Sequence, residues 1–426
     1  MSMWVKRVKL GVDQWLVQAG ASGSEFDIRF TTSDQIRFST WDGSNGYGMI
    51  TTRVFRDVSA WYHLVFQYDT AQATDTNRNK IYVNGEQISP SDTSAYNAGK
   101  HPPQNYDNPS WNNTTAFRIN DVTWTSSSPK DAVYSHIHHT DGYAYDASTF
   151  GSTDATTGEW KINTSPSITM GTNGFTILKD GNTITDQSSN SNNFTLGGGT
   201  LTKTEDCPDN VFATLNPLDV SRLANTGNTF SNGNLTVTDG SSNYLVAQST
   251  LAATTGKFYW EVKINATTST SVSGVGVCDL DNFSRADGAA NTAYGWIYAP
   301  DGDKRHNSSA TAYGDTYAAN DIIGIALDMT NGFLYFSKNG TWQNSGNPES
   351  GASGTNAAFG SISGTIGSHA YDGSSTQTHE YSFNFGNGYF GSTQISSAGT
   401  NASGIGIFEY DVPTGYTALS TKGLNL

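Results

Sequence analysis

Three histidines, His136, His138 and His139, form the most evident candidate for a metal site in this sequence. On a β-strand, His136 and His138 would point to the same face, and imidazoles at that spacing can both bind zinc. His139 would lie on the opposite face, and beyond it only Asp141 follows as a nearby ligand. Because Val133 and Ile137 occupy the other face, solvent exposure is the simpler explanation of the pair, and we expect no metal and no cofactor.

Two aspartate clusters offer oxygen ligands of the kind that calcium prefers. They are Asp279-Leu-Asp281-Asn282 and Asp301-Gly-Asp303. Neither has the spacing of a known calcium-binding loop, and short polar turns explain both. They do not change the expectation that the protein holds no metal.

Aromatic side chains stand next to short polar side chains in several turn-rich stretches. Rings of this kind stack on the apolar faces of sugars, while amides and carboxylates bind the hydroxyl groups. The candidate ligand-binding residues are Trp41, Asp42, Trp111, Asn112, Tyr298, Asp301, Asp303 and Trp342. Packing in a core or a loop is the alternative explanation for each of them.

The composition predicts an all-β protein with many turns. Of the 426 residues only 14% are charged, and there are 45 glycines. The 20 Phe, 21 Tyr and 10 Trp residues are spread along the whole chain, which favours folded cores over disorder.

The charge balance excludes two large classes of partner. With 23 Lys and Arg against 38 Asp and Glu, the net charge is −15, whereas nucleic acids and anionic membranes attract basic surfaces. No uncharged apolar stretch approaches the ~18 residues of a spanning helix, and the first residues lack the apolar segment of a signal peptide. Two cysteines, Cys207 and Cys278, cannot form a disulfide framework, so we expect synthesis in a reducing compartment.

Alternation of apolar and polar residues marks the expected strands. It is clearest at residues 25–30, 61–68 and 257–264, and Asn84-Gly85 and Asn339-Gly340 are typical of hairpin turns. Prolines and polar residues interrupt the pattern in residues 203–228, where we expect a connector. The sequence therefore predicts two antiparallel β-sandwiches in tandem, at residues 1–202 and 229–426.

The second half resembles a SPRY (B30.2-like) domain, a bent β-sandwich whose loops at one end bind a partner. The segments that carry this resemblance are Gly256-Lys-Phe-Tyr-Trp-Glu-Val262, Gly274-Val-Gly-Val277, Tyr294-Gly-Trp296, Asn320-Asp-Ile-Ile-Gly-Ile-Ala-Leu-Asp328, Gly332-Phe-Leu-Tyr-Phe-Ser-Lys-Asn-Gly340 and Tyr381-Ser-Phe-Asn-Phe-Gly386. They occur in the family order, and a C-terminal tail follows them.

The first half resembles a concanavalin A-like or laminin-G-like jelly roll, a family that binds glycans and proteins. The residues that carry this resemblance are Phe26-Asp-Ile-Arg-Phe30, Ser59-Ala-Trp-Tyr-His-Leu-Val65, Lys80-Ile-Tyr-Val-Asn-Gly85, Asp141-Gly-Tyr143 and Gly158-Glu-Trp160. The family usually has a strand before the segment that resembles Trp4-Val-Lys-Arg7, where this chain begins. Two outcomes are therefore open near Val5 to Leu10: a strand of another protein completes the sheet edge there, or the sandwich closes with one strand fewer and stays monomeric.

A jelly roll followed by a SPRY domain resembles structural proteins of tailed phages. This resemblance implies a non-enzymatic virion protein of a tail fibre or capsid surface, made in the host cytoplasm. Its expected partners are other virion proteins, further copies of itself and a host-surface glycan, with no nucleic acid and no membrane span.

The alternative function is a glycoside hydrolase on the jelly-roll scaffold. Glu25-Phe-Asp27 begins the Glu-x-Asp-x-x-Glu pattern of jelly-roll glucanases, but Phe30 stands where the second glutamate belongs. We therefore expect no enzyme activity. A cytosolic SPRY protein that binds peptides is a third possibility, which the jelly-roll partner disfavours.

Overall fold

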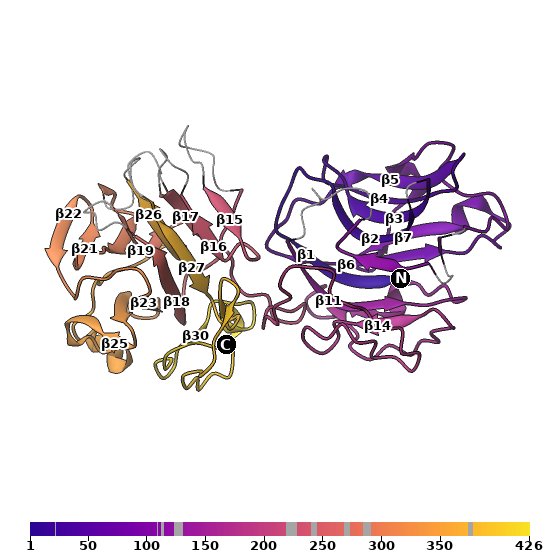
Figure 1. Cartoon of the computed structure of the whole chain (residues 1–426). Helices are drawn as coiled ribbons and strands as arrows, with labels where there is room; N and C mark the ends of the chain where they lie inside the picture. The colour runs from indigo at the N-terminus through magenta and orange to yellow at the C-terminus, as the bar shows by residue number, and fades with distance from the viewer. Residues whose placement is uncertain are drawn as a thin grey trace. The chain divides into compact units, whose positions relative to one another are not determined.

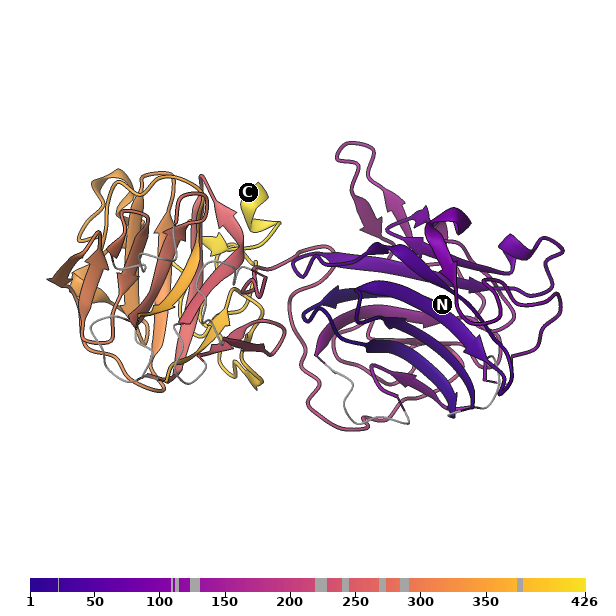
Figure 2. The ribbon, with the colours of Figure 1, turned by 90° about the horizontal axis from the view of Figure 1, so that it is seen from above.

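A computed structural model describes residues 1–21, 23–108, 110–111, 115–122, 131–218, 228–239, 245–267, 273–283, 291–373 and 378–426. In these residues the secondary structure is strands and short 3-10 helices, which confirms the expected all-β class (Figure 1). The chain forms two compact units, Met1–Lys203 and Thr204–Leu426. Seen from above, the strands of each unit run side by side in layers (Figure 2).

The first unit is a sandwich of two six-stranded antiparallel sheets. In spatial order, the first sheet contains β14 (Phe175–Ile177), β11 (Ala132–His139), β1 (Ser2–Arg7), β6 (Trp61–Tyr68), β7 (Asn79–Val83) and β8 (Glu86–Gln87). The second contains β10 (Phe117–Ile119), β2 (Gln14–Ala21), β3 (Ser24–Phe30), β4 (Gln35–Trp41), β5 (Gly46–Val54) and β9 (Thr93–Ala95). The short helices are η1 (Asp75–Asn77), η2 (Pro90–Asp92) and η3 (Ala147–Thr149).

The core of this sandwich follows from the alternation in β3. Phe26, Ile28 and Phe30 are fully buried in the cluster between the sheets, and Glu25 and Asp27 alternate with them. Hydrophobic burial on one face thus fixes the register of β3 against its neighbours β2 and β4.

A small hairpin, β12 (Gly151–Thr153) with β13 (Trp160–Ile162), adds a second layer over the first sheet. Its Trp160 donates a hydrogen bond from Nε1 to Nδ1 of His63 at 3.0 Å. Nε2 of His63 therefore carries the proton and donates to Ser2 Oγ at 2.9 Å. Trp4 stacks on the same imidazole at 4.8 Å, so the outer face of β1 and β6 is a packed layer.

Of the two alternatives for the segment near Val5, completion of an open sheet edge by another protein is wrong, and the sheet closes there with strands of this chain. β1 lies inside its sheet, where Val5 pairs with Tyr62 of β6 and with Tyr134 of β11, and all six residues of β1 are buried. The chain itself supplies both neighbours because β11 returns beside β1 from more than 120 residues away.

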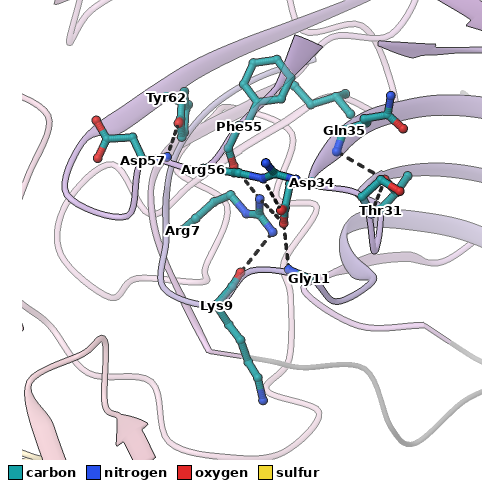
Figure 3. A network of polar contacts seen from close by, with 12 residues as sticks. Arg7, Lys9, Gly11, Thr31, Asp34, Gln35, Phe55, Arg56, Asp57 and Tyr62 are labelled. Atoms are coloured by element: carbon teal, nitrogen blue, oxygen red, sulfur yellow. Dashed lines mark hydrogen bonds and ion pairs between the residues drawn. The ribbon is translucent and has the colours of Figure 1, made fainter. Parts of the chain in front are cut away.

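A buried ion pair closes the end of β1 (Figure 3). Arg7 is fully buried, and its Nη1 lies 3.1 Å from Asp34 Oδ1 and donates to the carbonyl of Phe55 at 2.6 Å. Asp34 Oδ2 also accepts a hydrogen bond from Nε of the exposed Arg56 at 2.9 Å. Burial opposes ionisation of Asp34, but hydrogen bonds from Gly11, Arg56 and Arg7 prevail and lower the pKa of its carboxyl.

The second unit is also a two-sheet sandwich. In spatial order, one sheet contains β15 (Thr229–Ser231), β16 (Thr236–Thr238), β27 (Glu380–Asn384), β18 (Lys257–Ala266), β23 (Ile322–Asp328), β24 (Phe333–Lys338) and β25 (Thr341–Trp342), with β30 (Thr417–Ala418) parallel to β18. The other contains β17 (Leu245–Ala253), β26 (Ile366–Asp372), β19 (Ser273–Asp279), β20 (Gly295–Tyr298), β21 (Asp303–His306) and β22 (Ser309–Ala312). The remaining elements are the hairpin of β28 (Tyr389–Phe390) and β29 (Thr393–Gln394), and the helices η6 (Gln343–Ser345), η7 (Pro348–Ser353) and η8 (Gly423–Asn425).

Part of the stretch that we expected to be a connector, residues 203–228, packs into the second unit. Ala213 and Leu215 are fully buried in its main core. Phe212 and Leu215 form isolated bridges with Ser420 and Ser249. The described residues up to 218 thus contribute to this core because apolar side chains alternate with the polar ones there.

The C-terminal residues also belong to the second unit, where Glu261 of β18 holds them. Its carboxylate accepts hydrogen bonds from the backbone nitrogens of Glu409 and Tyr410 at 2.9 and 2.8 Å. The hydroxyl of Tyr259 and the amide of Asn384 donate to it at 3.1 and 3.3 Å. Burial raises the pKa of Glu261 to about 7, while these four donors act in the opposite direction.

Candidate ligand-binding site

A depression of about 300 Å³ opens at one end of the first unit. Met1, the end of β6 and the residues 69–71, 106–108, 111, 140 and 142–145 surround it. The lining residues with aromatic or polar side chains that matter below are Asp69, Tyr106, Asp107, Asn108, Tyr143 and Tyr145.

Two tyrosines form an aromatic platform in the depression. Tyr143 is 50% exposed, and its ring stacks on that of Tyr145 with centroids 6.3 Å apart and planes 18° apart. Gly142 has a φ of 77°, a value that side chains disfavour, and so allows the turn that presents Tyr143. Thr140 fixes this turn by donating from Oγ1 to the carbonyl of Tyr143 at 2.7 Å, so the platform is built before any ligand arrives.

Three polar side chains accompany this platform. The carboxylate of Asp69 accepts hydrogen bonds from its own loop, from Ala71 N at 3.2 Å and from Gln72 Nε2 at 2.6 Å. Asp107 is exposed, and among the described residues its carboxylate has no hydrogen-bond or ion-pair partner. Asn108 is only 3% exposed, and its Oδ1 accepts from Ser110 N at 2.8 Å.

Tyr106 connects the depression to one of the residues predicted from the sequence. Its hydroxyl donates to Asp42 Oδ2 at 3.1 Å, and burial raises the pKa of Tyr106 to about 12. Asp42 also accepts hydrogen bonds from Asn45 N and Ser44 N, which lower the pKa of its carboxyl. Asp42 therefore stays ionised and orients Tyr106 at the rim.

The other residues of the first half that we predicted to bind a ligand do not form a common site with Asp42. Trp111 lines the depression, but it is 7% exposed and packs on Phe26 with ring centroids 3.7 Å apart, so it belongs to the core beneath. Trp41, at the end of β4, is half-buried and does not line the depression. Asn112 lies outside the described residues.

The predicted residues of the second half contact neighbouring residues of the second unit. Tyr298 is fully buried and its hydroxyl donates to the carbonyl of Asp315, so it is not the exposed ring that we expected. The reason is that β20 lies inside its sheet. Asp301 and Asp303 both form ion pairs with Arg305, and half-buried Trp342 packs edge-on against Tyr259.

The sequence reasoning missed Tyr106, Tyr145, Asp69, Asp107 and Asn108 as site residues. Tyr143 appeared in it only through Asp141-Gly-Tyr143, as part of a family resemblance. A glycine turn followed by two tyrosines two residues apart was the local signal that could have drawn attention to this loop.

Two of the three histidines, His138 and His139, are buried and pack against neighbouring side chains. His138 is 4% exposed, bonds Thr176 Oγ1 through Nδ1 at 2.9 Å and stacks on Phe150, so the expected solvent-facing pair is wrong. Burial lowers the pKa of His138 to about 3, which keeps it neutral. His139 points into the core against Trp111, and the described residues contain no group of three or more metal-binding side chains.

Asp27, one of the two carboxylates that resemble a hydrolase pattern, is engaged by a cation. Asp27 is 1% exposed, and its Oδ2 lies 2.8 Å from Nη2 of Arg37 and accepts a hydrogen bond from Ser39. Phe30 is in the core, as its apolar side chain requires.

Comparison with known proteins agrees with this architecture. Residues 1–132 match the family model of the concanavalin A-like lectin/glucanases superfamily, and residues 257–387 match that of the SPRY domain. The chain carries a concanavalin A-like domain followed by a SPRY domain. Both expected resemblances are thereby confirmed, and both kinds of domain support a binding or adhesion role.

Among solved structures, the chain is similar to the crystal structure of the SPRY domain of human HERC1. The identity is 19%, the match covers 37% of this chain and 91% of that chain, and the TM-score is 0.30. In the part of the chain that the structure describes, no helix is both long and apolar enough to cross a membrane.

Proposed function

We propose that this chain is a non-enzymatic structural protein of a virus particle, on a tail fibre or capsid surface, which adheres to a host glycan. The observation that carries the adhesion is the exposed Tyr143 ring, which stacks on Tyr145 in a depression that Asp107 also lines. An aromatic face beside hydroxyl-binding groups is what recognition of a sugar requires.

The place in a phage particle rests on the order of the two domains, which resembles that of tailed-phage structural proteins. A net charge of −15 keeps the protein away from nucleic acid and fits a component exposed on the outside. Its partners in the particle are other virion proteins and further copies of the chain, after synthesis in the host cytoplasm.

The non-enzymatic character is supported by the state of the carboxylates. Asp27 is paired with Arg37, and the carboxylate of Asp69 accepts hydrogen bonds from its own loop, so both of these groups are already engaged.

Binding to immobilised host oligosaccharides tests the proposal, with Tyr143→Ala compared against Tyr294→Ala. Tyr294 is 43% exposed and lies in the SPRY domain, so it is a matched control for the loss of a surface ring. We expect Tyr143→Ala to weaken binding about tenfold, because an aromatic contact contributes ~1.5 kcal/mol, and Tyr294→Ala to leave it unchanged. Equal binding by both variants, or release of reducing ends from the glycan, would contradict the proposal.

The particle assignment has its own test. Mass spectrometry of purified phage particles should detect peptides of both domains after extensive washing. Detection of the protein only in the soluble fraction of infected cells would refute the virion assignment.

A further inference from the structure

Acidic side chains, and no basic ones, are among the described residues that line the depression. Among the described residues that line it, Asp69 and Asp107 are acidic, and there is no lysine, arginine or histidine. The carboxylate of Asp69 accepts hydrogen bonds from its own loop, whereas that of Asp107 has no partner among the described residues. Asp107 is therefore the acidic group that a ligand in the depression meets.

Asn108 also lines the depression, but it is only 3% exposed. Its Oδ1 accepts a hydrogen bond from Ser110 N, and its Nδ2, which has no partner among the described residues, has almost no accessible surface. Nδ2 therefore does not face a ligand in the depression, and the exposed groups that meet a ligand are Asp107 and Tyr143.

The exposed aromatic ring and the size of the depression indicate which kind of ligand fits it. Tyr143 offers a flat apolar surface, and no lysine, arginine or histidine is among the described residues that line the depression with it. Met1 also lines it, but its α-amino group donates to the carbonyl of Phe66, and burial lowers the pKa of this group to about 5, so it is uncharged at neutral pH. The volume of about 300 Å³ is at the lower end of the range for small-molecule sites, which fits the end of a glycan better than a long stretch of it.

We infer that the depression selects glycans whose terminal sugar is uncharged or carries an amine, and that it rejects sugars bearing a carboxylate, phosphate or sulfate. This inference rests on the proposed glycan binding and adds the chemical class of the ligand. Asp107 accepts hydrogen bonds from sugar hydroxyls and repels anions, and Tyr143 stacks on the apolar sugar face.

Paired oligosaccharides that differ only in the terminal sugar, neutral in one and acidic in the other, test the selection on the full chain. We expect the acidic member to bind at least about tenfold more weakly, a difference of 1.4 kcal/mol. The ratio should shrink as salt is added, since screening weakens exposed charges.

Asp107→Asn tests the residue, because it keeps the size of the side chain and removes its charge. It should narrow the ratio between neutral and acidic sugars. Glu159→Gln is the matched control, since Glu159 is exposed on the β12–β13 hairpin and its removal changes the net charge by the same amount. Glu159→Gln should leave the ratio as it is.

The outcomes separate this inference from the proposed function. Equal or tighter binding of the acidic sugar, lost in Tyr143→Ala, would overturn the charge selection while glycan binding at the depression stands. An equal effect of Asp107→Asn and Glu159→Gln would also overturn it. Absence of binding to every glycan of both classes would refute the proposed function, and the selection with it.

Discussion

Arg7 is a buried charge that several hydrogen bonds hold in place. Its guanidinium has no exposed surface, yet Asp34 and two backbone carbonyls surround it. Such a pair adds little when intact, but removing one partner leaves an uncompensated charge in the interior.

Arg7→Ala should therefore destabilise the first domain by about 3–5 kcal/mol. Arg56→Ala is the matched control, because Arg56 contacts the same carboxylate from the surface, where its side chain is 59% exposed, and should cost at most about 1 kcal/mol. Urea denaturation of both variants measures the difference. Similar costs for the two substitutions would show that burial does not govern this network.

Glu261 gives the SPRY domain a dependence on pH. Its folded-state pKa of about 7 lies above the unfolded value, so the folded state binds more protons between about pH 4.5 and 7. The stability linked to this group is fully present below about pH 4.5 and declines as the pH rises through 7. The melting temperature of the wild type should decrease when the pH is raised from 5 to 8.

Glu261→Gln provides the control for this pH effect. The variant should be less stable throughout, because an amide nitrogen faces backbone donors, but its midpoint should change less between pH 5 and pH 8. A wild type and a variant with parallel pH profiles would assign the titration to another group.

At the level of the elements, the sequence pattern predicted the turns, because their geometry depends on neighbouring residues alone. Asn84-Gly85 forms the expected hairpin between β7 and β8, with φ values of 48° and 86°, and Asn339-Gly340 does the same between β24 and β25. The partners of β1 were not predictable, because pairing with β11 joins segments far apart in the chain. Tyr298 was misplaced for the same reason, since its burial depends on the neighbours of β20.

The central position of β1 leads to a prediction about the start of the chain. Deletion of residues 1–10 should leave the first domain without native packing, because β6 and β11 would lose the strand that joins them. The near-UV circular dichroism of the first domain should disappear. A native-like spectrum after the deletion would mean that the sheet closes without β1.

For the whole molecule, the division into two compact units implies two independent folding units. Residues 204–426 expressed alone should unfold in one cooperative thermal transition. Residues 222–426 should be markedly less stable, because they lack Phe212, Ala213 and Leu215 from the core. Equal midpoints for the two fragments would show that residues 204–221 contribute nothing to folding.

The central claim concerns where the molecule meets its ligand, and a crystal structure of the full chain with its best-binding neutral oligosaccharide tests it most directly. Our account predicts a terminal sugar stacked on Tyr143, with a hydroxyl group that donates to the carboxylate of Asp107. A sugar bound on the SPRY domain, with the depression of the first domain empty, would contradict it.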